Sequence, residues 1–460
     1  MSVHGSQGLV QAGLRAHQSG QLDKAAQIYR DVLAQDPVNP VALSNLGLLL
    51  GETGQFGRAE ELLNRLIARA PRHVDGYANL ASVLHDQGKF NEAIDCAERG
   101  LKISPDHRKL LNTLASSLSG AQRYEEAVAL LTRITRAHPR YAKGYHYLGV
   151  TYTVLGQCDQ AVEAFDQAVR IDSRDTESLL ASAECLMIHG RAEQAMVRIE
   201  NALQLNAYDV RGLALKTLAL AELGRQDEER WLADPQRFVH TLRLSDLGYG
   251  AAEVGMLNRA LSEFASNEAS MREDPPEYAT RNSWHTTTNL ADSPNEAIGI
   301  LKQFILYAFG QRKKHLSDED PAHPFVRTPP DEVLIDLWAV KMTQRGKMIP
   351  HIHPGGWLSG VYYVDVPSIV DSPDGGEAGW LMVGTPRVDF KMTRQPITRA
   401  VKPEPGMMVT FPSYFWHDTV PLPADNQEQR LCLAYDLHPV KSERGRNDGR
   451  TSGASTAHTA

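Results

Sequence analysis

Cysteine is scarce in this chain, and the few cysteines are widely spaced. Among 460 residues there are 4 cysteines, and no two of them form a CxxC pair. They are Cys96, Cys158, Cys185 and Cys432. Such spacing does not indicate a disulfide framework. We therefore predict that the thiols are reduced and that the protein is cytoplasmic.

Long apolar runs and an excess of basic charge are also missing. No stretch approaches the roughly 20 apolar residues of a membrane helix, and the first residues lack a basic segment followed by an apolar one. The net charge of -8 argues against a dominant basic face. We therefore expect neither a nucleic acid nor a membrane as partner. The 42% of hydrophobic residues and 23% of charged residues are typical of ordered globular protein.

An internal repeat of 34 residues fills the first half of the chain, and three sets of positions share this period. One set is Pro37, Pro71, Pro105 and Pro139. The second is Gly20, Gly54, Gly88, Gly156, Gly190 and Gly224, with Gln122 as the one substitution. The third is Ala25, Ala59, Ala93, Ala127, Ala161 and Ala195. One period in three sets predicts stacked helical units.

Each set has a physical reason in a helix–turn–helix unit. The glycines end the first helix, where a left-handed backbone is easiest for glycine, and the prolines stop the second helix. A further set of small residues lets the two helices approach closely; it comprises Gly13, Gly47, Ala81, Ala115, Gly149 and Ala183. The pattern resembles the tetratricopeptide repeat. We predict six units and a capping helix near 210–223 with a more polar outer face, together spanning residues 6–225.

The resemblance implies a concave groove that binds a protein or a peptide. By repeat phase, Asn112, Lys143 and His146 should line the inner helices of this groove. They could hold a carboxylate or a polar peptide, although an ordinary solvated helix face explains the same residues. The array would then select partners and carry out no chemistry.

The repeat pattern stops after residue 225. Helices are expected near 254–269 and 294–314 within a linker and supporting segment, residues 226–330. Ser293 to Glu296 reads as a capping box with proline at the first helical position. The last residues, 441–460, have the composition of a disordered tail.

A different pattern begins at Val333, where short segments rich in Val, Tyr, Phe and Trp alternate with turn residues. We expect strands near 333–342, 346–353, 357–366, 378–384, 386–392, 397–402, 406–411 and 429–437. Eight short strands preceded by helices predict a barrel or jelly roll over residues 331–440.

Three histidines stand in two segments of this β-rich region. His351 and His353 lie in PHIHPGGW, and His417 ends FPSYFWH. On a strand, residues i and i+2 face the same side, so the first two can both point into a barrel. His417, from a distant strand, could complete one face of a metal site. Imidazole suits Fe(II) with open positions for a cosubstrate and O₂. Arg430 could hold a carboxylate through two parallel hydrogen bonds.

The segments H-x-H-P-x-x-W-x-S-G-x-Y-Y and F-P-S-x-x-W-H, with the trailing arginine, resemble the Fe(II)/2-oxoglutarate-dependent oxygenase superfamily over about residues 330–440. They are most similar to a branch that is often fused to tetratricopeptide repeats. The resemblance implies a double-stranded β-helix, Fe(II) and 2-oxoglutarate. It makes His351 and His417 metal ligands, Arg430 the partner of the 2-oxoglutarate C5 carboxylate, and Tyr363 a second contact to that carboxylate.

His353 departs from the family pattern, because the family usually has Asp or Glu at this position. His353 could itself ligate the metal and give a three-histidine face. Alternatively, water takes the third place, or His353 is the first ligand and Gly355 falls at the acidic position, leaving room for an anion. The nearby carboxylates of Asp365 and Asp418 lack the expected spacing.

The function implied by the resemblance is hydroxylation by a 2-oxoglutarate-dependent dioxygenase. The adjacent repeat array suggests a protein or peptide substrate. Two other functions stay open at this point. One is a non-catalytic repeat scaffold with a degenerate oxygenase barrel, and the other is a cupin-like three-histidine metal enzyme that uses no 2-oxoglutarate.

Overall fold

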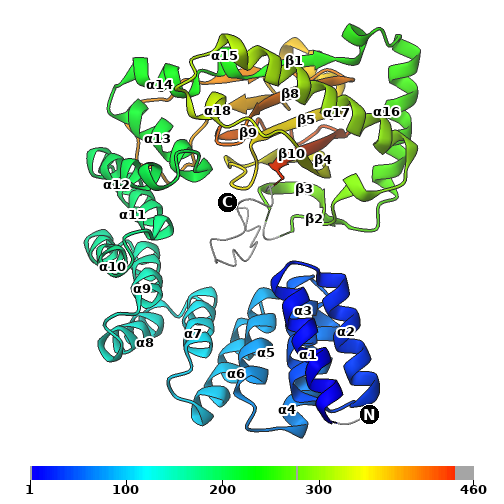
Figure 1. The fold of residues 1–460 in the computed structure, drawn as a ribbon. Coiled ribbons are helices and arrows are strands. Elements are labelled where there is room, and N and C mark those ends of the chain that lie inside the picture. The colour runs from blue at the N-terminus through cyan, green and yellow to red at the C-terminus, as the bar shows by residue number, and fades with distance from the viewer. Residues whose placement is uncertain (1–2, 276–277, 441–460) are drawn as a thin grey trace. The chain divides into compact units, whose positions relative to one another are not determined.

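The structure is a computed structural model that describes residues 3–275 and 278–440, so the predicted tail 441–460 lies outside the described residues. The chain divides into two compact units, residues 1–181 and 182–460 (Figure 1). The first is helical, and the second joins helices to β-sheets. We describe each unit by itself.

Antiparallel helix pairs build the first unit, as the 34-residue period predicts. The helices are α1 Val3–Gln18, α2 Leu22–Gln35, α3 Pro40–Glu52, α4 Phe56–Arg69, α5 Val74–Asp86, α6 Phe90–Ile103, α7 Arg108–Gly120, α8 Tyr124–Ala137, α9 Ala142–Val154 and α10 Cys158–Ile171. α11, Thr176–Ile188, begins in this unit and ends in the second. The period thus predicts the helical boundaries closely.

The turn residues of the repeat have the predicted left-handed backbone, and the small residues lie at the predicted close contacts between helices. The repeat glycines have φ between +70° and +74°, and Gln122, which replaces one of them, has φ of 60°. At Gly47 an added Cβ would lie 2.6 Å from Leu63 Cγ, and at Gly149 it would lie 2.7 Å from the Phe165 ring. These two glycines therefore bring paired helices into direct contact.

The helix expected to cap the stack does not have a polar outer face. α12 is Ala192–Leu205, and α13, Val210–Glu222, is buried along most of its length. Trp416 Nε1 donates a hydrogen bond to the carbonyl of Ala214 in α13, at 3.1 Å. α14 (Gln226–Ala233) and α15 (Pro235–Phe238) follow directly. The prediction is wrong because the β-rich region, and not solvent, covers α13.

Two antiparallel sheets form the β-rich region. The larger sheet has the order β1 His240–Arg243, β8 Met407–Pro412, β5 Leu358–Asp365, β10 Arg430–Pro439, β4 Val333–Met348, β3 Thr280–Thr286 and β2 Met271–Glu273. The smaller sheet has the order β7 Arg399–Val401, β6 Leu381–Val383 and β9 His417–Thr419. The fold class is therefore the predicted helical repeat array followed by a double-stranded β-helix, or jelly roll.

Several strands differ from their predicted positions. The segments 333–342 and 346–353 do not form two strands; β4 runs through to Met348, with Arg345 at a φ of 57°. Segment 386–392 forms no strand, because its polar groups contact the helices of the same unit: Arg387 pairs with Glu184, and Lys391 N donates to the Met187 carbonyl at 3.2 Å. Strands β1, β2, β3 and β9 lie outside the predicted segments.

Two long helices brace the larger sheet, close to their predicted positions. They are α16, Ala251–Ser266, and α17, Glu296–His315. Asn258 of α16 accepts a hydrogen bond from the Tyr362 hydroxyl of β5, at 2.6 Å. The helix α17 starts two residues later than predicted. Asn295 is the N-cap and accepts from Ala297 N at 2.9 Å, so Pro294 precedes the cap.

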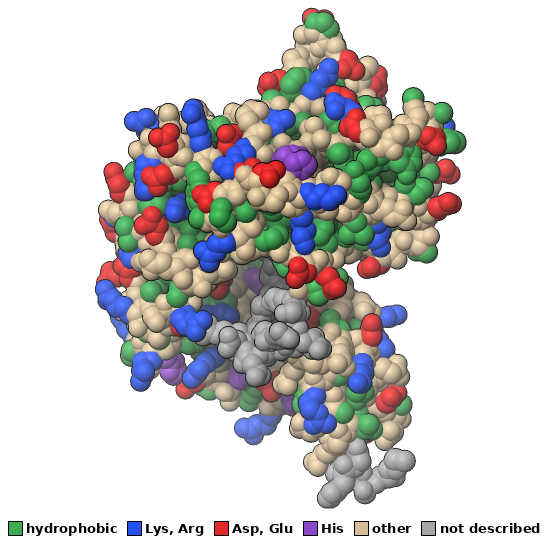
Figure 2. All heavy atoms as spheres, turned by 45° about the horizontal axis from the view of Figure 1, so that its top comes forward, with side chains coloured by type: hydrophobic (Ala, Val, Ile, Leu, Met, Phe, Trp, Pro, Cys, Tyr) green, Lys and Arg blue, Asp and Glu red, His purple; other side chains and the backbone are tan. Residues whose placement is uncertain are grey.

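The remaining elements are short. α18 is Pro324–Arg327, and 3₁₀ turns occur at Leu244–Leu247, Leu290–Asp292, Leu316–Asp318, Ser368–Asp371 and Pro373–Gly375. None of the four cysteines forms a disulfide. None of the described helices combines the length and the apolar composition that crossing a bilayer requires. On the face shown in Figure 2, acidic and basic side chains are interspersed.

Candidate metal centre

The three predicted histidines lie together inside the second unit. One ligand atom from each of His351, His353 and His417 falls within 4.8 Å of the other two. The ring centroids of His351 and His417 are 4.2 Å apart, and no ring is more than 6% exposed. Residues far apart in the sequence thus form one buried imidazole cluster.

Backbone pairing holds these histidines in place. His351 and His417 form an isolated antiparallel bridge, and each N–H donates to the other residue's carbonyl at 3.1 Å. His353 N donates to the Ser413 carbonyl at 3.1 Å. The expectation that His351 and His353 share a strand is therefore wrong. They follow the end of β4, and pairing with β9 and the loop before it makes the rings converge.

Hydrogen bonds on the outer nitrogens set the tautomers of two rings. His351 Nδ1 lies 2.8 Å from the Ile349 carbonyl, and His417 Nδ1 lies 3.0 Å from the Phe415 carbonyl. A carbonyl only accepts, so each Nδ1 carries the proton and each Nε2 keeps a lone pair. Burial, and then the neighbouring His353, lower the pKa of His417 to about 3. This ring is therefore neutral near pH 7, the form that binds a metal.

A buried carboxylate supports the third ring. His353 Nδ1 is 2.9 Å from Asp436 Oδ2, and the other oxygen of Asp436 accepts from Ser359 Oγ at 2.6 Å. Burial alone would raise the pKa of Asp436, but His353 and Ser359 outweigh it and hold that pKa below its usual value. A carboxylate behind a ligating histidine fixes the ring and increases its basicity.

The inner nitrogens fit a metal ion. His353 Nε2 and His417 Nε2 are 3.2 Å apart. The Nδ1 atoms of the two rings face away from each other, toward Asp436 and the Phe415 carbonyl. The two nitrogens lie at hydrogen-bond distance, and when both rings carry their proton on Nδ1, both Nε2 lone pairs can bind one shared cation. Nitrogen ligands about 2.1 Å from a metal are about 3 Å from one another when adjacent. The donor set therefore fits a transition metal.

Arg430 lies near the cluster on β10 and is 2% exposed. Its Nε donates to the Gly379 carbonyl at 2.9 Å, and Nη1 contacts the Cys432 and Met342 sulfur atoms at 3.5 and 3.6 Å. Among the described residues no carboxylate pairs with this guanidinium. A buried cation without a counter-charge is costly, so the site is suited to an anionic ligand.

A narrow cavity of about 50 Å³ connects the histidines with Arg430. Its other lining residues are Trp338, Val340, Met342, Met348, Ser359, Gly360, Val361, Leu381, Phe411, Thr419, Cys432 and Ala434. Mostly apolar walls around three imidazoles and one guanidinium exclude water and strengthen the charge interactions inside.

Several other sequence-predicted residues do not line this cavity. Tyr363 packs against Arg430, whose Cζ is 5.0 Å from the ring centroid, and burial raises the Tyr363 pKa well above its usual value. Asp365 instead accepts from Ser262 and Gln429, at 2.8 and 2.7 Å. Gly355 and Asp418 are also absent from the lining. Among the described residues, no carboxylate thus lines the cavity in place of His353.

The three groove residues have different surroundings. His146 is buried, with Nδ1 2.9 Å from Ser178 Oγ, so it lies between helices and not on an open surface as predicted. Asn112 accepts from the Tyr141 hydroxyl at 2.7 Å. Lys143 is exposed. Asn112 and Lys143 stay predictions for a partner-binding groove.

Asp436 and Ser359 were missed by the sequence reasoning. Alternate residues of a strand share a face, and Arg430, Cys432 and Ala434 of β10 line the cavity. Counting on by two from Arg430 reaches Asp436, so the alternation could have identified it. Ser359 has no comparable signal, because many serines precede a glycine.

Comparisons with known proteins agree with this arrangement. Residues 336–436 match the family described as "Putative 2OG-Fe(II) oxygenase". Residues 16–83 and 76–208 match two families described as "Tetratricopeptide repeat". Among curated proteins, none matches the chain significantly.

Solved structures of repeat proteins are similar to part of the chain. A tetratricopeptide repeat protein from Parabacteroides merdae is 18% identical, with a TM-score of 0.41, over 49% of this chain and 88% of its own. The pilF protein of Pseudomonas aeruginosa is 21% identical, with a TM-score of 0.37, over 43% of this chain and 89% of its own.

Proposed function

We propose that this chain, which joins tetratricopeptide repeats to a domain of the 2OG-Fe(II) oxygenase family, is an Fe(II)- and 2-oxoglutarate-dependent dioxygenase. One observation carries the proposal. Three buried imidazoles meet at one point, with their outer nitrogens held by two carbonyls and a carboxylate.

In this proposal His351, His353 and His417 hold the metal. We favour ligation by His353 because its Nδ1 faces Asp436 and its Nε2 faces His417. When bound, Fe(II) and 2-oxoglutarate supply the oxidising power: 2-oxoglutarate, O₂ and a substrate C–H bond give succinate, CO₂ and a hydroxylated substrate.

In this proposal, residues of the chain bind 2-oxoglutarate and orient it. Arg430 pairs with the distal carboxylate of 2-oxoglutarate, and its bond to the Gly379 carbonyl fixes the direction of the guanidinium. The Tyr363 ring packs against Arg430, and in this proposal its hydroxyl is a second contact to the same carboxylate. Phe411 and Val361 exclude water from the reacting centre.

The substrate in this proposal is a protein or peptide that the repeat array recruits, through a groove that includes Asn112 and Lys143. The support is the fusion of a repeat array to the oxygenase domain. We place the array at 6–225, the supporting segment at 226–330 and the catalytic core at 331–440, in a cytoplasmic protein.

An anaerobic titration of the full chain with Fe(II) and 2-oxoglutarate tests the activity. We expect the weak visible charge-transfer band of a metal–oxoglutarate complex, and succinate release on admission of O₂ with candidate proteins. His417→Ala should abolish both, whereas His315→Ala, at an exposed histidine of α17, should change neither.

The same titration separates the alternatives. A repeat scaffold with a degenerate barrel would give no band in the wild-type chain. A three-histidine enzyme without 2-oxoglutarate would bind the metal and keep its activity after Arg430→Ala, because only the oxoglutarate reaction needs the guanidinium.

A further inference from the structure

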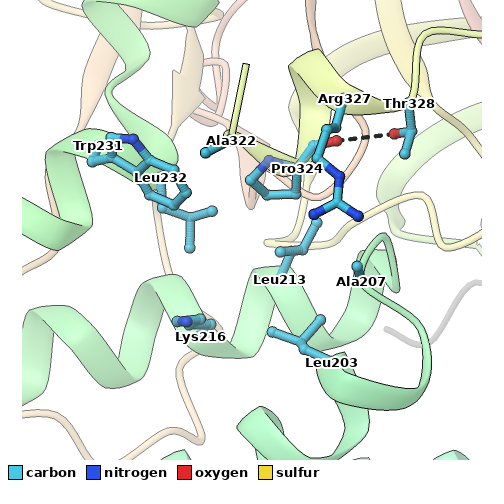
Figure 3. A pocket seen from close by; sticks show the side chains of 10 residues that line it. All are labelled: Leu203, Ala207, Leu213, Lys216, Trp231, Leu232, Ala322, Pro324, Arg327 and Thr328. Atoms are coloured by element: carbon cyan, nitrogen blue, oxygen red, sulfur yellow. Dashed lines mark hydrogen bonds between the residues drawn. The ribbon is translucent and has the colours of Figure 1, made fainter. Parts of the chain in front are cut away.

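A second cavity, of about 180 Å³, lies elsewhere in the second unit, where the last repeat helices meet the turn at α18. Figure 3 shows Leu203 and Leu213 on one side and Pro324 on the other, with Trp231 at one end. Lys216 of α13 and Arg327 of α18 complete the lining. The cavity thus combines apolar walls with two cationic side chains.

Lys216 departs from the repeat pattern. Five positions lead to it at a spacing of 34 residues. Four hold leucines that are no more than 7% exposed, and the fifth holds Ser182, which is 1% exposed: Leu46, Leu80, Leu114, Leu148 and Ser182. In the four repeats with leucine, that side chain fills the space between helices. In α13 the same position carries a half-buried ammonium group, and the α18 turn covers it.

Neither cation is engaged in a hydrogen bond within the cavity. Among the described residues, half-buried Lys216 and exposed Arg327 form no side-chain hydrogen bond or close ion pair, although Lys216 interacts electrostatically with Glu228 and helps to lower the pKa of that carboxyl. The acidic groups nearby are engaged elsewhere. Glu228 accepts from Arg225 at 2.6 Å, and Asp320 accepts from Trp231 Nε1 at 2.8 Å. Among the described residues, the cavity lining therefore carries two cations and no carboxylate.

We propose that this cavity binds a carboxylate carried beside an aliphatic group. The aliphatic group contacts Leu203, Leu213 and Pro324, and the carboxylate pairs with Lys216 and Arg327. The volume corresponds to about six water molecules, which suits a single side chain. This chemistry occurs at the C-terminal residue of a peptide and in a free branched-chain acid. The proposal does not rest on the oxygenase activity.

Trp231 provides the readout, because its indole lies in the cavity wall. The full chain is titrated with N-acetyl-leucine while tryptophan fluorescence is recorded, and N-acetyl-leucinamide serves as the uncharged probe. We expect saturable binding of the acid and at least tenfold weaker binding of the amide. Trp231→Phe should remove the signal.

Substitutions then assign the two cations. Lys216→Met and Arg327→Met should each weaken binding of N-acetyl-leucine at least tenfold. Arg230→Met, at an exposed arginine next to Trp231 that does not line the cavity, should leave it unchanged. Lys216→Leu restores the residue of four earlier repeats, so it should raise the unfolding temperature while it abolishes binding.

Equal affinity for acid and amide, unchanged affinity in Lys216→Met, or no binding of either probe would overturn the proposal. The unfolding temperature of each variant shows that lost binding is not lost folding. The two sources are compared with N-acetyl-Gly-Gly-Leu and 4-methylpentanoate. Tighter binding of the peptide assigns the cavity to a chain terminus, and equal binding assigns it to a small acid.

Discussion

The helical stack of the first unit and the β-rich region of the second differ in what they bury. Of the described residues in the first unit, no Asp, Glu, Lys or Arg is buried, and its interior consists mainly of Ala, Leu and other apolar side chains. The β-rich region buries Arg430 and Asp436 beside three histidines. Buried charges cost free energy unless they are paired, so their retention at one cavity indicates function there.

From this comparison we expect substitutions in the two regions to affect different properties. In the stack, each residue contributes through packing with its neighbours, and substitutions should change unfolding alone. In the β-rich region, a few polar side chains should control ligand binding with less effect on unfolding. Five substitutions test this division, in order of decreasing effect.

His417→Ala should abolish metal binding in the chain, because it removes the ligand that bridges two separate segments. Equilibrium dialysis against Fe(II) or Co(II) under argon measures the loss. Far-UV circular dichroism should show an unchanged helical signal. Metal binding that survives in both His417→Ala and His351→Ala would remove the proposed site.

Arg430→Ala should weaken 2-oxoglutarate binding by about 100-fold, since truncating one partner of a buried charge pair costs about 2–5 kcal/mol. Metal affinity without 2-oxoglutarate should stay the same. Isothermal titration of the metal-loaded chain measures both, with Arg272→Ala, at an exposed arginine of β2, as control. An equal loss in both variants would contradict a specific role for Arg430.

Asp436→Asn should weaken metal binding by about 10–100-fold, the usual cost of losing a carboxylate behind a ligating histidine. Asp336→Asn on the neighbouring strand β4 is the matched control. His353→Asp places two carboxylates side by side, so the double variant His353→Asp/Asp436→Asn should bind metal more tightly than His353→Asp alone. If Asp436 only stabilises the fold, Asp436→Asn will lower the unfolding temperature and leave the metal affinity unchanged.

Gly47→Val should destabilise the stack by about 1–3 kcal/mol, because its Cβ would meet Leu63 at 2.6 Å. Gly57→Val in α4 is the matched control, since an added Cβ there meets nothing within 4 Å. Urea unfolding followed by circular dichroism measures the difference, and metal affinity should be equal in both. Equal unfolding midpoints would contradict the close helix contact.

Gln122→Gly should stabilise the stack by about 0.5 kcal/mol, because a left-handed backbone costs less for glycine, although glycine loses more entropy on folding. The reverse change, Gly88→Gln, should destabilise by a similar amount. Thermal unfolding of the full chain detects both shifts, and a stabilised Gly88→Gln variant would show that the turn conformation is not limiting.

The two regions also differ in how far the sequence predicts them. Helix boundaries in the stack follow from local rules, since Gly20, Pro37 and Ala25 each act within one repeat. The strands depend on distant partners. Segment 386–392 has a strand-like composition, but Arg387 and Lys391 contact α11 and the residues beside it. The local sequence pattern does not reveal contacts of this kind, because the partner residues are distant in the sequence.

The candidate site was predicted in part. The spacing of His351, His353 and His417 identified the cluster, yet the reason for their convergence was pairing with β9 and not a shared strand. Asp436 was not predicted, although alternation along β10 from Arg430 leads to it. Tyr363 pairs with Cys432 between β5 and β10, and its ring packs against Arg430, so its expected contact with the cosubstrate stays a prediction.

The bridge between His351 and His417 gives an occupied site a mechanical role. The two residues belong to segments that are distant in the sequence. A pair of backbone hydrogen bonds joins the two residues, and one more joins His353 N to the Ser413 carbonyl. An ion bound by both rings would crosslink these segments at an isolated bridge, where few backbone hydrogen bonds hold them together. Binding and release of the metal would then change the free energy of local opening around residues 351 and 417. Slower amide hydrogen exchange at these residues would show that the metal is bound.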